Sequence, residues 1–212
     1  MRYKITIEYD GTSLLGWQEQ LDGPSVQDYL QKALNCFTPL EETNDAPLSD
    51  EEYEDAGTGR RLQKTDKIIV SGAGRTDAGV HATAQVAHFD LKEDLVDWKL
   101  REAINARLRE MEAPVSVIAV EKVGNDFHAR FSARGRGYLY RILNRRAPAV
   151  LEKNRVWWVP VPLDVEKMRE GAGYLIGHHD FSSFRAAACQ AKSPVKTLED
   201  RKSTRLNSSH RT

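Results

Sequence analysis

The stretch SGAGRTDAGVHA, residues 71–82, combines the small residues of a ligand-binding loop with two opposite charges. Three of its twelve residues are glycine, and Arg75 and Asp77 stand two positions apart among them. Loops that bind phosphate usually lack carboxylates, because a fixed negative charge repels the ligand. An arginine here can hold a phosphate and keep a neighbouring carboxylate ionised. The pair is thus suited to nucleophilic or acid–base chemistry at the sugar or base of a nucleotide.

The glycine spacing excludes the best-known nucleotide loops. Gly72, Gly74 and Gly79 do not fit the GxGxxG pattern of dinucleotide-binding loops, and the stretch lacks the GK[ST] ending of a P-loop. A structural alternative stays open, in which Asp77 only caps a turn.

Metal binding is not expected from the remaining side chains. Neither Cys36 nor Cys189 belongs to a CxxC pair, so the sequence indicates no disulfide framework and no zinc site. No set of three ligands is evident among the other candidates, which are His81, His88, His178 and His179. We therefore expect no metal site.

The chain carries no net charge, but its charges are segregated. It has 212 residues with 31 basic and 31 acidic side chains. Residues 41–55 contain eight acidic residues and no basic one, whereas residues 127–157 contain eight basic residues and one acidic one. A local basic stretch of this kind suits a polyanion, although it can also be a solvated strand and loop. No apolar run reaches the roughly 20 residues that span a bilayer and no leader pattern is present, so we expect a cytosolic protein.

Hydrophobic periodicity predicts the elements that must position this loop. Alternating apolar residues predict a strand over 2–11, with Tyr3, Ile5, Ile7 and Tyr9 on its buried face. A helix is expected over 23–37 with Ser25 as its N-cap, and a second over 97–108 with Trp98, Arg101, Ile104 and Leu108 on or beside its buried stripe. Further strands are expected at 67–72, 84–91 and 114–123. The resulting order βαββαβ predicts a ferredoxin-like domain over 1–123, interrupted by an acidic surface insertion at 41–63 that shows no sustained period.

A second α+β unit is expected over 124–200. The pattern predicts a strand at 137–143, a helix at 164–177 that ends at Gly177, and a polar loop over 178–200. The buried stripe of that helix is expected at Val165, Met168, Ala172 and Leu175. One strand and one helix are too few to close a sheet, so the second ferredoxin-like unit is expected to be incomplete, with residues 201–212 as a tail outside the fold.

Four motifs together resemble the TruA family of tRNA pseudouridine synthases. They occur in the family's order and are YKITIEYDGTSLLGWQEQ (3–20), GPSVQDYLQKAL (23–34), GAGRTDAGVHA (72–82) and DFHARFSARGRGYLYRILNRR (126–146). The resemblance covers Arg2 to Leu198 apart from the acidic insertion, and it implies two ferredoxin-like units with antiparallel sheets. It also implies isomerisation of uridine to pseudouridine in the anticodon stem-loop of tRNA, at tRNA positions 38–40, by a cytoplasmic homodimer without a cofactor.

The resemblance also assigns roles to individual residues. It makes Asp77 the nucleophile, which attacks either the ribose or the pyrimidine ring, Arg75 the residue that helps extrude the target nucleotide, and Tyr138 the aromatic that stacks on uracil. Two stretches are expected to touch tRNA, namely Phe127, His128, Ala129, Arg130 and Phe131, and Ala188, Cys189, Gln190, Ala191 and Lys192.

Two other functions were weighed against this one. A noncatalytic ferredoxin-like RNA-binding protein would stack bases on aromatic residues, but it would not need an aspartate between two glycines. A small-molecule enzyme would use Arg75 to hold a phosphate and would show no salt-steep affinity for tRNA. The family's later segments, including an arginine that pairs with the catalytic carboxylate, are not visible after Asp200, so we expect this chain to be truncated and impaired or inactive.

Overall fold

The structure is a computed structural model with mixed helices and strands. It describes residues 1–35, 37, 52–54, 61–63, 67–185 and 193–199. Contacts divide the chain into two units, the first with residues 1–141 and 152–155 and the second with residues 142–151 and 156–212. No helix within the described part of the chain is long and apolar enough to cross a membrane.

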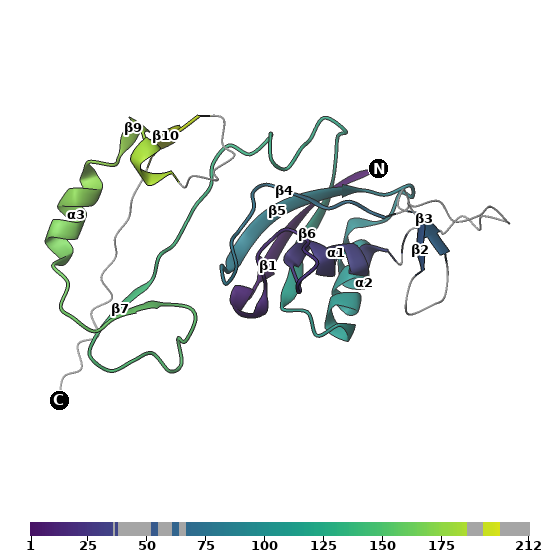
Figure 1. Ribbon diagram of the computed structural model, residues 1–212. Helices are drawn as coiled ribbons and strands as arrows, with labels where there is room; N and C mark the ends of the chain where they lie inside the picture. The colour runs from purple at the N-terminus through teal and green to yellow at the C-terminus, as the bar shows by residue number, and fades with distance from the viewer. Residues whose placement is uncertain (36, 38–51, 55–60, 64–66, 186–192, 200–212) are drawn as a thin grey trace. The chain divides into compact units, whose positions relative to one another are not determined.

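The first unit is built on a four-stranded antiparallel sheet (Figure 1). Its strands are β1 (Arg2–Tyr9), β4 (Ser71–Gly72), β5 (Ala82–Asp90) and β6 (Val115–Val123). The order across the sheet is β4-β5-β1-β6, so the first strand in the sequence pairs with both β5 and β6. The predicted alternation of β1 is confirmed, because Tyr3, Ile5, Ile7 and Tyr9 are all buried.

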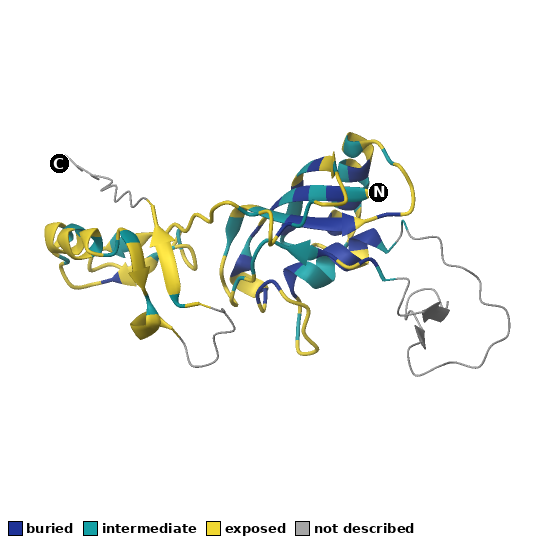
Figure 2. Cartoon of the chain, turned by 90° about the horizontal axis from the view of Figure 1, so that it is seen from above, coloured by how far each residue is buried: buried dark blue, intermediate teal, exposed yellow. Residues whose placement is uncertain are grey.

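Two helices cover the face of the sheet to which these residues point (Figure 1). Helix α1 spans Val26–Leu34, and its N-cap is Ser25 as predicted, with the Ser25 hydroxyl accepting the Asp28 N–H at 3.1 Å. Helix α2 spans Asp97–Glu110 and follows β5. The core between helices and sheet includes Val26, Leu30, Leu34, Leu100, Ile104 and Leu108. Figure 2 shows that buried residues are concentrated in this first unit.

Three expectations for the first unit need correction. The strand predicted at 67–72 is reduced to β4, because only residues 71–72 pair with β5. Trp98 does not join the buried stripe of α2 and is 59% exposed, since Leu100 occupies the core side of that turn. Within the acidic insertion, where no regular element was expected, β2 (Glu52–Glu54) pairs antiparallel with β3 (Arg61–Gln63). The other residues of 41–63 lie outside the described residues.

The second unit consists of short elements. Strand β7 (Ile142–Asn144) runs parallel to β8 (Trp157–Val159), helix α3 spans Val165–Gly173, and β9 (Gly177–Asp180) pairs antiparallel with β10 (Val195–Leu198). A short 3₁₀ helix, η3, lies at Ser182–Phe184.

Here too the sequence predictions are only partly correct. Of the strand predicted at 137–143 only its last two residues lie in β7, because residues 137–141 find no partner strand within the described part of the chain. Helix α3 ends at Gly173 with Tyr174 as its C-cap, and Gly177, with φ of +115°, begins β9 instead. The expected polar loop contains β9, η3 and β10. No described residue of α3 is buried, so its predicted apolar stripe packs into no core.

Candidate functional site

The loop between β4 and β5 is held firmly at its centre, next to the candidate nucleophile. The Tyr9 hydroxyl lies 2.9 Å from the Thr76 hydroxyl, and the Trp17 N–H donates to the Thr76 carbonyl at 3.0 Å. The Gly79 N–H donates to the Leu14 carbonyl at 3.3 Å. Burial raises the pKa of Tyr9, while its hydrogen bond to Thr76 opposes this shift. The loop is therefore attached to the end of β1 and to the segment that follows it.

Two glycines of that segment allow its backbone to approach the loop. A Cβ atom on Gly16, which has φ of +102°, would lie 2.4 Å from the Thr76 carbonyl oxygen. A Cβ atom on Gly11, in the 3₁₀ helix η1 (Gly11–Ser13), would lie 2.1 Å from the Val80 carbonyl oxygen. Real Cβ contacts are never this short, so both positions require glycine. The close approach explains why glycines before α1 matter to a loop some 60 residues later.

Arg75 and Asp77 are both exposed on this fixed loop. The Asp77 backbone carbonyl accepts the Val80 N–H at 3.2 Å and closes a tight turn. Within the described residues, however, the Asp77 carboxylate accepts no hydrogen bond, and no ion pair joins it to Arg75. The carboxylate is thus open to an incoming molecule rather than occupied as a turn cap. The expected direct support from Arg75 is not formed in the free protein.

The far end of the loop is tied to a short segment of the basic stretch. The His81 Nδ1 accepts the Gly11 N–H at 3.2 Å, and the His81 Nε2 lies 2.7 Å from the Asn154 carbonyl oxygen, to which it can only donate. Arg155 donates to the Asp10 carboxylate at 2.9 Å. Hydrogen bonds from Thr12 and then Arg155 hold the pKa of Asp10 well below its usual range. Asp10 and Arg155 were not predicted as site residues, because nothing local in the sequence links positions 145 residues apart.

The predicted RNA-contact stretch 127–131 packs on the sheet face opposite the helices. His88 of β5 stands beside Lys4 of β1 in the register, and Lys4 alternates with the buried core residues of that strand. The His88 Nδ1 accepts the Ala129 N–H at 3.2 Å, and Ala129 is 2% exposed. Arg2 fixes the start of the stretch by donating to the Phe127 carbonyl at 2.8 Å. Ala129 is therefore an anchor of the stretch rather than a surface contact.

A row of neighbouring rings, tilted against one another, leads from this anchor to the surface. The His88 and His128 ring centroids are 4.6 Å apart, and those of His128 and Phe131 are 4.4 Å apart. Burial, followed by the charges of His128 and Arg2, lowers the pKa of His88, so its neutral, accepting form is favoured. Phe131 is 78% exposed, and the Arg130 guanidinium lies 5.9 Å from its ring centroid. The stretch thus presents one aromatic ring and one cation to solvent.

The remaining predicted residues fall in two places. Tyr138 is 74% exposed in a segment that precedes β7 and forms no regular element. The second predicted tRNA-contact stretch, residues 188–192, lies outside the described residues. The structure therefore brings the loop, Tyr138 and residues 127–131 into the first unit and does not place the other stretch.

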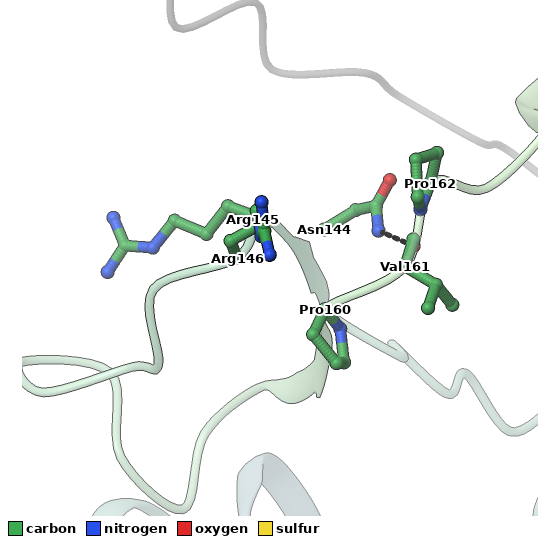
Figure 3. Close-up of a pocket in the computed structure, with 6 residues that line it drawn as sticks. All are labelled: Asn144, Arg145, Arg146, Pro160, Val161 and Pro162. Carbon is green, nitrogen blue, oxygen red and sulfur yellow. Dashed lines mark hydrogen bonds between the residues drawn. The ribbon is translucent and has the colours of Figure 1, made fainter.

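A surface hollow of about 490 Å³ lies in the second unit (Figure 3). Its shape depends on Asn144, which donates to the carbonyls of Val159 at 2.9 Å and Val161 at 2.6 Å. Its lining residues are Asn144, Arg145, Arg146, Pro160, Val161 and Pro162. The two arginines at this proline-lined hollow belong to the basic stretch 127–157, but they stand apart from the Asp77 loop in the chain. Among the described residues, no group of three potential ligands could hold a metal.

Comparison with known proteins gives one consistent result. The family profile described as "tRNA pseudouridine synthase" matches residues 5–132, more than half of the chain. The chain is 50% identical over 200 residues to tRNA pseudouridine synthase A of Paramagnetospirillum magneticum, covering 93% of this chain and 66% of the relative. It is 51% identical to the protein of the same name from Rhodospirillum centenum, covering 94% and 70%, and 50% identical to that from Dinoroseobacter shibae, covering 94% and 66%. The chain thus spans about two thirds of the length of these relatives.

Proposed function

The chain belongs to the tRNA pseudouridine synthase family, and from this premise we propose that it contributes to the isomerisation of uridine to pseudouridine in the anticodon stem-loop of tRNA. The observation that carries the proposal is the unoccupied, exposed carboxylate of Asp77 on a loop that β1 and its following segment hold in place. Catalytic groups must be held on such rigid supports, because small misplacements are costly.

In the proposed reaction Asp77 is the nucleophile. The N1–C1′ glycosidic bond of uridine breaks, the uracil rotates while bound, and a C5–C1′ bond forms. The C5 proton is lost and N1 gains one, so the product is an isomer and the reaction needs no oxidant or reductant. Attack of the carboxylate on the ribose or on the pyrimidine ring is compatible with this outcome.

Other residues of the proposed site bind and position the substrate. Arg75, exposed two residues before Asp77, would contact the backbone of the extruded nucleotide and stabilise the space that the base leaves. Tyr138 offers an exposed ring that can stack on uracil. Arg130 and Phe131 would contact the RNA directly, while Ala129 and His128 hold them in place. Residues 188–192 are proposed as a second RNA-contact stretch.

The finer architecture is also a proposal. We infer a ferredoxin-like domain over 1–123 with the insertion at 41–63, a partial second domain of the same kind over 124–200, and a tail at 201–212. The order of elements in the first unit, β1, α1, β4, β5, α2 and β6 in an antiparallel sheet ordered β4-β5-β1-β6, supports the first of these. A cytoplasmic homodimer that binds tRNA is proposed from the family alone.

Chemical mapping of pseudouridine in unmodified tRNA tests the proposal. The chain is compared with Asp77→Asn and with Asp22→Asn, a control at another exposed aspartate of the first unit, and the Paramagnetospirillum relative verifies the assay. We expect less pseudouridine from the chain and from the control than from the relative, since the chain spans about two thirds of its length, none from Asp77→Asn, and equal tRNA binding by all three.

Two results would contradict it. Unchanged pseudouridine formation by Asp77→Asn would exclude Asp77 as the nucleophile. Tight tRNA binding without any product, both by the chain and by the chain extended at its C-terminus with the segment of the relative that it does not cover, would indicate a noncatalytic RNA-binding protein instead.

A further inference from the structure

Arg136 contacts the backbone at the beginning of the catalytic loop. Its guanidinium donates to the Ala73 carbonyl at 2.8 Å, across 63 positions of sequence. Its Nε also lies 3.4 Å from the place that a Cβ atom on Gly74 would occupy. The guanidinium therefore lies directly against the first two residues of the loop.

This contact completes the hydrogen bonding of the peptides that lead into the loop. The Ala73 N–H donates to the Val86 carbonyl at 2.8 Å, and the Gly74 carbonyl accepts from the Gln85 side chain at 2.7 Å. Both of these partners belong to β5, so they fix the loop only toward the sheet. Among the described residues, Arg136 supplies the hydrogen bond from outside the sheet, to the Ala73 carbonyl.

The position of Arg136 in the chain gives the contact its significance. It stands two residues before Tyr138, the proposed uracil-stacking residue, and its partner Ala73 stands four residues before Asp77. The hydrogen bond between Arg136 and Ala73 is thus only a few residues from Tyr138 on one side and from Asp77 on the other. In the proposed reaction these two groups must face the same uracil. Residues 133–141 form no regular element, so no strand pairing performs this alignment for them.

We propose that Arg136 is a positioning residue that sets the Asp77 loop relative to Tyr138, acting through the Ala73 carbonyl and not by binding RNA phosphate. The inference rests on the proposed function, because the alignment matters only if both groups act on one base. A displacement of about 1 Å at a reacting group can cost about a hundredfold in rate.

The test compares Arg136→Ala, Arg136→Lys and Arg134→Ala in the whole chain. Arg134 is an exposed arginine two residues earlier that forms no hydrogen bond or ion pair with any described residue, so its replacement removes the same charge without removing a contact. Single-turnover rates of pseudouridine formation, the Kd for tRNA and its dependence on salt are measured for each. We expect Arg136→Ala to lower the rate about 10- to 100-fold, with the Kd and the salt slope close to wild type. Arg136→Lys should recover part of the rate, because lysine can donate one bond to the carbonyl.

Hydrogen exchange of the free protein gives a readout that does not depend on turnover. Amides in peptides covering residues 73–81 should exchange faster than in the wild type when Arg136 is replaced by alanine. In Arg134→Ala their exchange rates should equal those of the wild type. Equal exchange in both variants would overturn the proposal whether or not the chain forms pseudouridine. Arg136→Ala could instead lower the slope of log affinity for tRNA against log salt by about one unit while bound tRNA forms pseudouridine at an unchanged rate. That result would also overturn the proposal and would make Arg136 a phosphate contact. Absence of product from the wild-type chain, also after it is extended with the segment of the relative that it does not cover, would instead count against the proposed function.

Discussion

Replacing Gly16 by alanine should damage the Asp77 loop far more than replacing Gly79, although both glycines have positive φ. Gly16 has φ of +102° and Gly79 has φ of +79°. An added Cβ on Gly16 would lie 2.4 Å from the Thr76 carbonyl oxygen, whereas nothing lies within 4 Å of one on Gly79. Comparing the two variants therefore distinguishes the cost of backbone strain alone, at Gly79, from the cost of strain together with a steric clash, at Gly16.

These contacts determine how much unfolding free energy each variant is expected to lose. For Gly79→Ala, strain in the left-handed region costs about 1–2 kcal/mol, and the lower entropy of the unfolded chain returns part of it, which leaves about 1 kcal/mol. For Gly16→Ala, comparable or larger strain adds to the displacement of Thr76, which weakens its hydrogen bond with the Trp17 N–H, so we expect a loss of about 3 kcal/mol.

Urea unfolding followed by tryptophan fluorescence measures both values. Trp17 is only 3% exposed, whereas Trp98, Trp157 and Trp158 are already 40% exposed or more, so the change in emission reports chiefly on the neighbourhood of Trp17. Free energies of unfolding that agree within about 0.5 kcal/mol for the two variants would refute the close backbone approach at Gly16.

Two other predictions concern the support of the site. Ser25→Ala removes the side-chain cap of α1, whose hydroxyl accepts the Asp28 N–H, and should cost about 1 kcal/mol in urea unfolding, with Ser13→Ala as an exposed control. The folded-state pKa of His88 is lowered, so its contribution to stability is complete above the unfolded pKa of about 6.5 and is lost as pH falls below it toward the folded value. His88→Asn keeps an acceptor for the Ala129 N–H but does not titrate in this range, so it should flatten the dependence of the unfolding free energy on pH. The same pH dependence in the wild type and in His88→Asn would contradict this role of His88.

The sequence predicted elements well where burial repeats with a regular period. The alternation in β1 and the Ser25 cap of α1 are local patterns, and both appear in the structure as expected. Trp98 was misplaced because α2 has apolar residues on more than one side, and periodicity alone does not decide which side meets the sheet. The prediction of Gly177 as a helix cap was wrong. A glycine after a helical pattern suggests a cap with positive φ, but here the glycine with positive φ is the first residue of β9.

The sequence draws attention to Arg75 and Asp77, but it does not reveal the contacts that support their loop. Arg75 and Asp77 are recognisable because charged residues between glycines are unusual, and their exposure agrees with a role at a surface loop. Among the described residues no bond joins Arg75 to Asp77, since side chains two positions apart on a loop need not face each other. Arg136 and Asp10 could not be predicted, because their partners are 63 and 145 positions away and carry no local pattern.

The same geometry gives a physical reason for two of the motifs to occur together. The motif YDGTSLLGW supplies Gly11 and Gly16, and each of these lies against a backbone carbonyl of the motif GRTDAGVHA. A side chain at either glycine would push the loop off the end of β1, and at Gly16 it would also press against the Asp77 backbone, whose carbonyl carbon would lie 3.1 Å from the added Cβ. The first motif therefore belongs to the candidate active site as its backing surface, and substitutions in it should alter the placement of Asp77 before they alter the affinity for tRNA.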